Sequence, residues 1–372
     1  MGGRWDGVRA GQGGKVIAAS PFVVIPAGGS GTRLWPLSRS GRPKHLAPIP
    51  GRDKTLLRET YERALGLTDQ VIILTEAGQA DLVREELPEL DADGVIVEPS
   101  PRGTTSALGL AALELLARDP DAVMLSMAAD HVIGDLPEWE RAGRLALGTA
   151  AGSDHLVTVG LRPRHPATGY GYIRASGPYQ GHSDVLVVDG FVEKPDLEQA
   201  TEYLRDGNYF WNLNTFSWRA SVFLDELRRW SPEHFDGLTA VVRAARAGDS
   251  AAAARLYGSL SNQAVDYTVL ERTDRLLLVP AQFGWDDVGS WPELHEILAS
   301  DAEGNFVQGE AVLVESKGSL VLGEGLLVAG IGLEDMIVVV SGSAVLICPK
   351  SRAQDVKLLT EQLRRTGKIN YL

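Results

Sequence analysis

A glycine-rich segment near the amino end carries the residues best suited to bind phosphate. Gly28, Gly29 and Gly31 fall within four consecutive positions. Consecutive backbone N–H groups in such a turn form a concave anion site, and glycine lets a ligand approach closely. Arg33 adds a planar guanidinium and Lys44 adds a second positive charge, and both suit phosphate oxygens. The spacing therefore predicts a polyphosphate site.

Two common phosphate loops do not fit this segment. A Walker A loop requires Gly-Lys followed by Ser or Thr, whereas Gly31 is followed by Thr32-Arg33. A dinucleotide fingerprint requires its glycines to open a helix directly, and Trp35-Pro36 interrupts any helix here. The segment is therefore predicted to bind phosphate in another way.

The bulk composition narrows the class of protein. The chain has 372 residues, of which 44% are hydrophobic and 23% charged, as is typical of one large globular domain or two. A formal net charge of −13 argues against binding to nucleic acid or to an anionic membrane. No apolar run approaches transmembrane length, and residues 1–20 lack a signal-peptide core. We expect a cytoplasmic enzyme that recruits a divalent metal to handle polyphosphate.

Buried strands alternate with helices through the first third of the chain. Strand patterns occur at 22–25, 71–74, 95–97 and 122–127, and helical patterns at 55–65, 79–86 and 105–117. This alternation predicts an α/β fold with a Rossmann-like, mostly parallel sheet flanked by helices and ligands beyond the carboxyl ends of the strands. Gly28, Glu98 and Asp130 fall just past predicted strands, as that arrangement requires.

The pattern changes beyond about residue 300. Short β runs separated by turn residues occur at 305–307, 311–314, 319–322, 326–328, 336–340 and 344–348. They predict a small β-helix-like module, closed by a helix at 351–364. The expected domains are a disordered extension at 1–20, a catalytic domain at 21–300 and this module at 301–372. The module is expected to serve packing or dimerisation, and a homodimer is expected.

The whole string from Phe22 to Leu46 resembles the signature of sugar-1-phosphate nucleotidyltransferases, G-G-x-G-T-R-L-x-P-L followed by P-K. Trp35 and Ser38-Arg39 resemble the mannose-1-phosphate guanylyltransferase branch of that family. The resemblance implies nucleotide contacts from the residues of the turn, namely Ala27, Gly28, Gly29, Ser30, Gly31 and Thr32. It also implies that Arg33 and Lys44 are catalytic.

A second segment, Glu98 to Thr104, resembles the E-P-x-x-R-N-T segment of guanylyltransferases. A carboxylate there offers two acceptors to the adjacent N1–H and N2–H₂ donors of guanine, although a surface or helix-start glutamate is the alternative. The implied nucleotide contacts come from Glu98, Arg102, Gly103 and Thr104. Gly103 stands where the family has Asn, and Thr105-Ser106 where it has Ala-Pro, which keeps another nucleotide open.

Four segments resemble the sugar-binding part of the family. They are similar to P-E-T-G-Y-G-Y-I, F-x-E-K-P, W-N-(S/A)-G-(M/I)-F and S-x-D-Y-x-V-M-E. The implied sugar-binding residues are Gly169, Tyr170, Gly171, Glu193, Asn212 and Asp266. Lys194 is implied as a third catalytic residue, on the sugar phosphate. Asn214 stands where the family has glycine, so we predict left-handed backbone there, which Asn tolerates well.

Two aspartates are implied as metal ligands. Asp130 lies in a segment that resembles P-A-D-H, and Asp287 in one that resembles W-x-D-x-G-S-W. Mg²⁺ prefers one or two carboxylates together with phosphate oxygens. Register with the family assigns the second ligand to Asp287 rather than Asp286, and a packing role is predicted for His131.

The resemblance as a whole implies transfer of GMP from GTP to α-D-mannose 1-phosphate, giving GDP-mannose and pyrophosphate. The sugar phosphate is already an anionic nucleophile, so the reaction needs positioning and charge neutralisation rather than a general base. Two alternatives stay open. One is the same chemistry with another sugar 1-phosphate or nucleotide. The other is a regulatory relative that binds nucleotide sugar without turnover, against which the presence of all five implied catalytic and metal residues argues.

Overall fold

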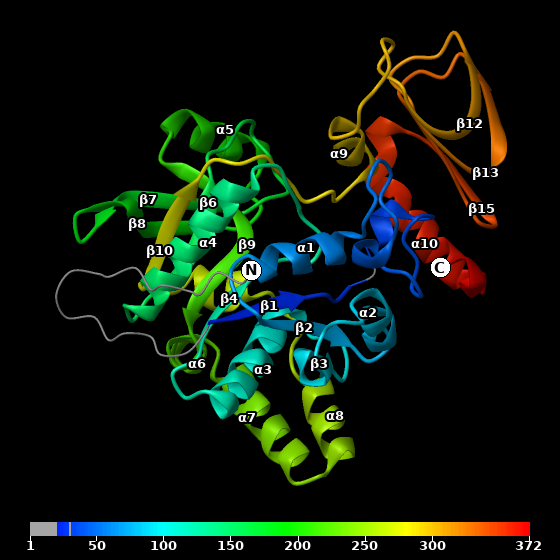
Figure 1. The fold of residues 1–372 in the computed structure, drawn as a ribbon. Helices are drawn as coiled ribbons and strands as arrows, with labels where there is room; N and C mark the ends of the chain where they lie inside the picture. Colours follow the sequence, from blue (N-terminus) through cyan, green and yellow to red (C-terminus); the bar gives the residue numbers. More distant parts are fainter. Residues whose placement is uncertain (1–20, 30) are drawn as a thin grey trace.

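The computed structural model describes residues 21–29 and 31–372 (Figure 1). A mixed sheet of nine strands flanked by helices forms the larger part of the described chain, and a four-stranded sheet forms a smaller module near the carboxyl end. The extension predicted at 1–20 and the predicted ligand-binding residue Ser30 lie outside the described residues.

The large sheet and its helices account for most of residues 21–296. Its strands are β1 (Phe22–Pro26), β2 (Gln70–Glu76), β3 (Val95–Glu98), β4 (Val123–Ser126), β6 (Leu156–Leu161), β7 (Tyr172–Tyr179), β8 (His182–Val192), β9 (Tyr209–Arg219) and β10 (Leu276–Ala281). The helices are α1 (Leu56–Leu65), α2 (Ala80–Glu86), α3 (Gly103–Arg118), α4 (Leu136–Ala151), α5 (Leu197–Asp206), α6 (Ala220–Trp230), α7 (Pro232–Arg246), α8 (Ser250–Gly258) and α9 (Trp291–Glu296). Two short strands, β5 (Val132–Ile133) and β11 (Trp285–Asp286), pair with each other.

The sheet is parallel in its first half and mixed in its second. Its strand order is β3-β2-β1-β4-β9-β6-β10-β8-β7, and β1 pairs in parallel with both β2 and β4. The predicted α/β arrangement of the first third is confirmed. Later strands add antiparallel pairs, because β9 runs against both β4 and β6, and a tight turn at 180–181 joins β7 to β8. Among the described residues, no helix is both long and apolar enough to cross a membrane.

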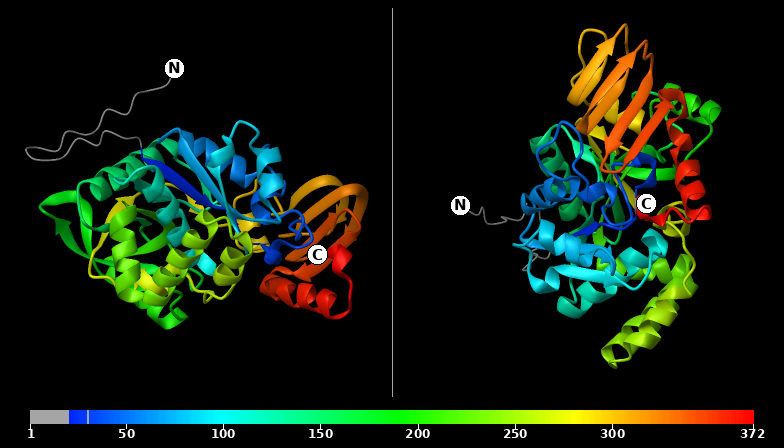
Figure 2. Two further views of the ribbon diagram at one scale, coloured as in Figure 1. Left: turned by 90° about the horizontal axis from the view of Figure 1, so that it is seen from below. Right: turned by 90° about the vertical axis from the view of Figure 1, so that its right-hand side faces the viewer.

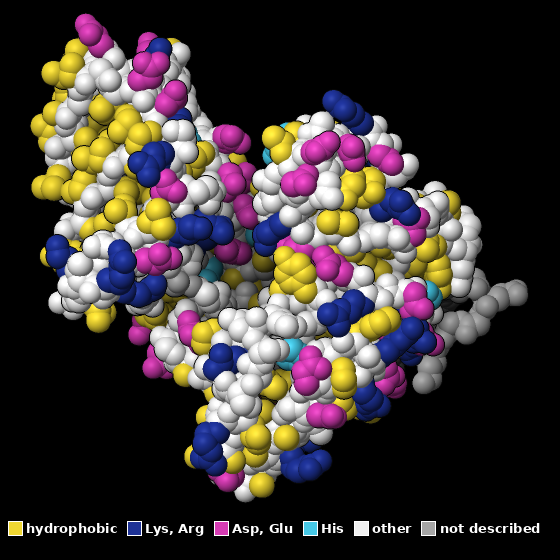
Figure 3. Space-filling model, turned by 180° about the vertical axis from the view of Figure 1, so that it is seen from behind, with side chains coloured by type: hydrophobic (Ala, Val, Ile, Leu, Met, Phe, Trp, Pro, Cys, Tyr) yellow, Lys and Arg dark blue, Asp and Glu magenta, His cyan; other side chains and the backbone are white. Residues whose placement is uncertain are grey.

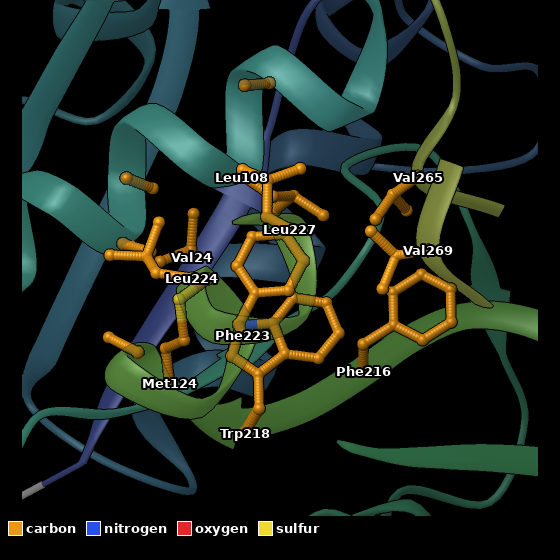
Figure 4. Packing of buried hydrophobic residues seen from close by; sticks show 14 of the residues in the cluster. Val24, Leu108, Met124, Phe216, Trp218, Phe223, Leu224, Leu227, Val265 and Val269 are labelled. Atoms are coloured by element: carbon orange, nitrogen blue, oxygen red, sulfur yellow. The ribbon is translucent and has the colours of Figure 1, made fainter. Parts of the chain in front are cut away.

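Hydrophobic residues fill both faces of the sheet. On one face, Val24, Met124 and Trp218 pack beneath α3 and α6, with Phe223 stacked on Trp218 at 4.4 Å (Figure 4). On the other face, Val23 belongs to a second cluster that includes side chains from α1 and α4. A strand buried on both faces reads as a continuous apolar run, which is why β1 could be predicted from the sequence.

The carboxyl-terminal module is a four-stranded, mostly parallel sheet. Its strands are β12 (Phe306–Val314), β13 (Leu320–Ile331), β14 (Met336–Ser341) and β15 (Ala344–Pro349). The first three pair in parallel and β15 is antiparallel to β14. The six predicted β runs merge into these four strands, with a register shift after Gly309 where two runs join. The terminal helix α10 (Val356–Arg365) starts later than the predicted 351, because residues 350–355 form 3₁₀ turns instead.

The module packs on the loop that follows β1. A third hydrophobic cluster contains Leu34 and Trp35 from that loop, Trp291 from α9, and Leu320 and Ile337 from the module. The helix α10 contacts the 3₁₀ turn η1 (Thr32–Leu34). Two further views also place the carboxyl-terminal helix beside this early segment (Figure 2). The Trp35 indole N–H donates to the carbonyl of Tyr371 at 2.6 Å, which ties the end of the chain to the glycine-rich loop.

Candidate active site

Except for Ala27, the described residues that were predicted for the site line three cavities with shared walls. The Glu98 cavity (about 470 Å³) also contains Gly28, Gly29, Arg102, Gly103 and Thr104. The Asp130 cavity (about 440 Å³) contains Gly31, Thr32, Arg33, Lys44 and Asp287. The Tyr170 cavity (about 1030 Å³) contains Gly169, Gly171, Glu193, Lys194 and Asn212. Asn214 lines all three cavities. Figure 3 shows the molecule hollowed between the carboxyl-terminal module and the larger part.

The glycine-rich loop uses its glycines in different ways. Gly31 has a φ of 59°, and a Cβ on it would lie 2.4 Å from the Cβ of Lys44. Glycine is therefore required there so that Lys44 can pack against the loop. A Cβ on Gly28 or Gly29 would meet nothing within 4 Å, so these two glycines leave open space beside the Glu98 cavity. Ala27 is buried, and its N–H donates to the carbonyl of Leu74 at 2.7 Å, so it lies beneath the loop.

Lys44 joins the two predicted metal ligands. Its side chain is buried, and its Nζ donates to Asp130 Oδ2 at 2.7 Å and to the backbone carbonyl of Asp287. Burial alone would raise the pKa of Asp130, but attraction to Lys44 and His131 outweighs this effect and lowers that pKa to about 2. Burial and repulsion from Glu293 raise the pKa of Asp287.

The two aspartates fit the requirements of Mg²⁺. Both line the Asp130 cavity, where Arg33 and Lys44 supply positive charge for phosphates. Asp287 Oδ1 accepts from the N–H of Gly289 at 3.0 Å, which fixes the orientation of the carboxylate. Among the described residues there is no cluster of three or more His, Cys, Asp or Glu that could hold a metal. Two carboxylates with the remaining positions left to phosphate and water are the set that Mg²⁺ prefers.

The turn that carries Asp287 is strained. Val288 has a φ of 47°, a left-handed conformation that is rare for a β-branched residue and is concentrated at functional sites. Its N–H donates to Asp286 Oδ1 at 2.6 Å. Asp286 lines the Tyr170 cavity but not the Asp130 cavity, and burial raises its pKa to about 6. The predicted packing role of His131 is confirmed, because its ring lies edge-on to Trp285 at 5.3 Å and accepts a hydrogen bond from that indole.

Glu98 lies at the end of β3, buried in the Glu98 cavity wall. Burial raises its pKa to about 7, although the hydroxyl of Tyr257 donates to Oε2 and opposes the shift. Its other oxygen, Oε1, has no intramolecular partner among the described hydrogen bonds. Thr104 Oγ1 accepts from the N–H of Val265 at 2.9 Å, which ties the start of α3 to the opposite wall.

The departure at Gly103 has a structural reason. Gly103 begins α3 with a φ of 75°, and a Cβ there would lie 2.2 Å from the carbonyl oxygen of Gln263. The segment 262–267 passes close over the start of the helix and forms part of the Glu98 cavity. A residue with a side chain at 103 would therefore displace that segment.

Three predicted sugar-binding residues and Lys194 form two separate polar pairs. Asn212 Nδ2 donates to Asp266 Oδ1 at 2.9 Å, and Lys194 Nζ lies 2.8 Å from Glu193 Oε1. A Cβ on Gly171 would lie 2.5 Å from Glu193 Oε2, so glycine makes room for that carboxylate. Burial, with repulsion from Glu193, raises the pKa of Asp266 to about 7.

Aromatic side chains form the wall of the Tyr170 cavity. The Tyr170 ring lies 5.2 Å from the ring of Trp211 and 4.8 Å from that of Trp285, both edge to face. Asn214 has a φ of 51°, so the left-handed backbone predicted there is confirmed. Its N–H donates to Asn212 Oδ1 at 3.1 Å, which holds Asn214 at the junction of the three cavities.

Sequence reasoning missed several residues that line these cavities. They are Arg164, His165, Glu293, Gln354 and Lys357. His165 opens the segment 165–173 that resembles P-E-T-G-Y-G-Y-I, and Arg164 directly precedes it, so a wider reading of this segment could have assigned them a role. Gln354 and Lys357 belong to the carboxyl-terminal module, and no local pattern indicates that this module reaches the cleft.

Two known protein families match this chain in sequence. Residues 22–304 match the family described as nucleotidyl transferase, and residues 309–363 match the MannoseP isomerase/GMP-like beta-helix domain. The protein is therefore an enzyme of the nucleotidyltransferase class. More specifically, the chain belongs to the nucleotidyl transferase family and carries the associated beta-helix domain.

Named relatives agree with this assignment. The chain is 38% identical over 364 residues to mannose-1-phosphate guanylyltransferase of Escherichia coli (strain K12), covering 94% of this chain and 75% of the relative. It is 39% identical over 351 residues to alginate biosynthesis protein AlgA of Pseudomonas aeruginosa, covering 93% and 72%. A crystal structure titled mannose-1-phosphate geranyltransferase, from Thermus thermophilus, matches with a TM-score of 0.81 at 33% identity, covering 93% of this chain and 100% of that one. These relatives support sugar-phosphate nucleotidyl transfer as the reaction class.

Proposed function

We propose that this enzyme transfers GMP from GTP to α-D-mannose 1-phosphate and releases pyrophosphate, with Mg²⁺ as cofactor. The observation that carries the proposal is the arrangement of three cavities around Asn214. One offers a buried carboxylate, the next offers cations beside two aspartates, and the third offers polar groups beside an aromatic wall. Relatives named as mannose-1-phosphate guanylyltransferases support the choice of substrates.

The Glu98 cavity suits guanine. Oε1 of Glu98 is available to accept from the base while Oε2 accepts from Tyr257. Each carboxylate oxygen has two lone pairs, so Oε2 can accept a second bond as well. Gly28 and Gly29 line the same cavity, and their lack of side chains leaves room for the nucleoside between the loop and Glu98.

The Asp130 cavity suits the polyphosphate. Asp130 and Asp287 would hold Mg²⁺, which supplies charge neutralisation to the phosphates of both substrates when bound. Arg33 would bind the phosphates with its planar guanidinium. Lys44 already pairs with Asp130, so its role is to hold that carboxylate and to offset negative charge in the cavity.

The Tyr170 cavity suits the sugar. Glu193 and Asn212 would bind ring hydroxyls, because they offer acceptors and donors beside the aromatic wall. Asp266 accepts from Asn212 and therefore orients the Asn212 amide. Lys194 lines both this cavity and the Glu98 cavity, where its ammonium can reach the sugar phosphate and the α-phosphate between them.

The reaction is a displacement at the α-phosphorus. An oxygen of the mannose 1-phosphate attacks that phosphorus and forms the new P–O bond. The bond from the α-phosphorus to the bridging oxygen breaks, and pyrophosphate leaves with the electron pair. No proton transfer is required, so the side chains act by positioning and by electrostatic stabilisation.

The decisive experiment measures pyrophosphate release with Mg²⁺, pairing each nucleoside triphosphate with a panel of sugar 1-phosphates. We expect the highest kcat/KM with GTP and mannose 1-phosphate. Highest turnover with a different pair would overturn the substrate assignment and leave the reaction class. GTP binding without pyrophosphate release from any pair would contradict catalysis.

In Asp130→Asn, kcat is expected to fall by about 10³-fold, because a metal contributes several kcal/mol. Full activity in that variant would contradict the metal assignment.

We also propose a homodimer through the carboxyl-terminal module. Figure 3 shows hydrophobic side chains gathered over this module. On the strands of the module, those with more than half of their surface exposed are Val312, Leu326, Leu327, Ile331, Val345 and Ile347. Exposed apolar groups gathered in this way mark protein interfaces. Light scattering after size exclusion should give twice the chain mass, and Leu327→Lys should shift the enzyme toward monomer. A monomer in the unmodified enzyme would contradict the proposal.

A further inference from the structure

The carboxyl-terminal helix brings a lysine to the Asp130 cavity. Lys357, the second residue of α10, lines this cavity together with Thr32, Arg33 and Lys44. Gln354, three residues earlier, lines the neighbouring Tyr170 cavity. Two residues of the module therefore face the cleft that the catalytic residues form.

The position of α10 is fixed by packing. Val356 is buried in the hydrophobic cluster that the module shares with the loop after β1, and Thr360 is buried one turn further on. The helix contacts η1, which carries Arg33. The hydrogen bond from Trp35 to Tyr371 closes the far end of this contact. Lys357 is held on this helix while its own side chain is exposed to the cavity.

The electrostatic setting of Lys357 points to an anionic ligand. A lysine in the first turn of a helix opposes the helix dipole, so local helix stability does not account for it. Within residues 21–29 and 31–372, the ion pairs do not include Lys357. Lys44 is already paired with Asp130, so Arg33 and Lys357 are the cations of this cavity that face solvent.

We propose that Lys357 binds the terminal phosphates of the nucleotide, the two that leave as pyrophosphate. This assignment rests on the proposed function for its nucleotide chemistry. Arg33 lies in the adjacent 3₁₀ turn and would bind the same phosphates from the other side. An ammonium at that place favours the leaving group as its charge develops. The module is then part of the active site, in addition to any role in packing or dimerisation.

The test compares Lys357→Gln with Arg365→Gln. Arg365 lies on the same helix, is exposed and does not line the described cavities, so both variants remove one positive charge from α10. In Lys357→Gln, we expect the KM for GTP and, in the reverse reaction, the KM for pyrophosphate to rise about tenfold, since one charged contact corresponds to a factor of that order. The KM for mannose 1-phosphate should not change. Lys357→Arg should recover most of the loss.

Calorimetric binding of inorganic pyrophosphate with Mg²⁺ separates this inference from the proposed function. Pyrophosphate carries neither base nor sugar, so weaker binding in Lys357→Gln alone supports the assignment whatever the substrates are. The unmodified enzyme could turn over no sugar phosphate and still bind pyrophosphate more tightly than Lys357→Gln. The proposed function would then fail, and the assignment of Lys357 to the terminal phosphates would stand. Equal pyrophosphate binding and equal KM values in Lys357→Gln and unmodified enzyme would overturn it. An equal loss in Arg365→Gln would overturn it as well.

Discussion

Lys44 connects the two aspartates of the candidate metal site. Its ammonium contacts the Asp130 carboxylate and the Asp287 carbonyl, so repulsion between the two acids is offset before a substrate arrives. The lysine fits at this place because Gly31 carries no side chain. At Gly31, glycine is needed for contact within the protein, whereas the sequence alone suggested contact with a ligand.

Gly31→Ala is predicted to disable the site by moving Lys44. The added Cβ would lie 2.4 Å from the Cβ of Lys44, at a φ of 59° that already disfavours a side chain. We expect kcat/KM to fall about 100-fold, because small displacements of positioning groups have effects of that size. Gly41→Ala is the control, since a Cβ there meets nothing within 4 Å. Unchanged kcat/KM in Gly31→Ala would show that Lys44 tolerates displacement.

Glu98 is predicted to make GTP binding depend on pH. Its pKa is raised to about 7, so at pH 6 most of the free enzyme carries a protonated carboxyl that has lost acceptor capacity. Raising the pH to 8 restores the carboxylate that guanine requires, and the KM for GTP should fall about tenfold over that range. GTP itself also loses a phosphate proton at about pH 6–7, but this change in the substrate is the same for unmodified enzyme and for Glu98→Gln. The difference between the two KM profiles therefore isolates Glu98, and parallel profiles would contradict its role.

Neighbouring segments constrain each other at the entrance to the Glu98 cavity. The start of α3 and the segment 262–267 approach so closely that Gly103 has no space for a side chain. The second segment continues into the π-helical turn η4 (Asp266–Leu270), which carries Asp266. A change at the start of α3 is therefore transmitted to the group that orients Asn212.

Gly103→Asn, which installs the residue usual in the family, is predicted to weaken this enzyme. The side chain must displace the backbone at Gln263, and we expect a loss of about 1–3 kcal/mol of stability together with a higher KM for GTP. Thermal unfolding and steady-state kinetics measure the two effects. Gly148→Asn on exposed α4 surface is the control, because a Cβ at Gly148 meets nothing within 4 Å. An unaffected Gly103→Asn enzyme would mean that 262–267 moves freely.

Elements with strong local patterns could be predicted from the sequence, and long-range contacts could not. The strands β1 to β4 are apolar runs between helices, so their type and their succession along the chain could be predicted. Asn214 was predicted to be left-handed because it stands where the family has glycine, and Asn tolerates that backbone well. The antiparallel position of β9 and the contact of α10 with η1 depend on packing between distant residues. No local pattern specifies either of them, and Lys357 was missed for this reason.

At the scale of the whole molecule, one hydrophobic cluster contains residues from both the large-sheet part and the carboxyl-terminal module. The predicted division into 21–300 and 301–372 follows the change in sequence pattern and stays a prediction. The cluster crosses that boundary, since Leu34 and Trp291 pack with Leu320 and Ile337. The module therefore buries part of the catalytic loop, and the loop buries part of the module. Such an arrangement favours cooperative unfolding over independent unfolding of two domains.

Ile337→Ala is predicted to destabilise both parts in a single transition. Ile337 is fully buried in the shared cluster, and its truncation should cost about 2–5 kcal/mol of unfolding free energy. The matched control is Ile369→Ala in the terminal turn (Ile369–Tyr371), where the side chain is 66% exposed and the expected change lies within about 0.5 kcal/mol. Calorimetry and loss of GTP binding should report the same lowered Tm in Ile337→Ala. If the module instead melted first and left GTP binding intact, the cluster would not couple the two parts. In that case, the position of Lys357 in the cleft would depend on a contact that opens separately from the catalytic fold.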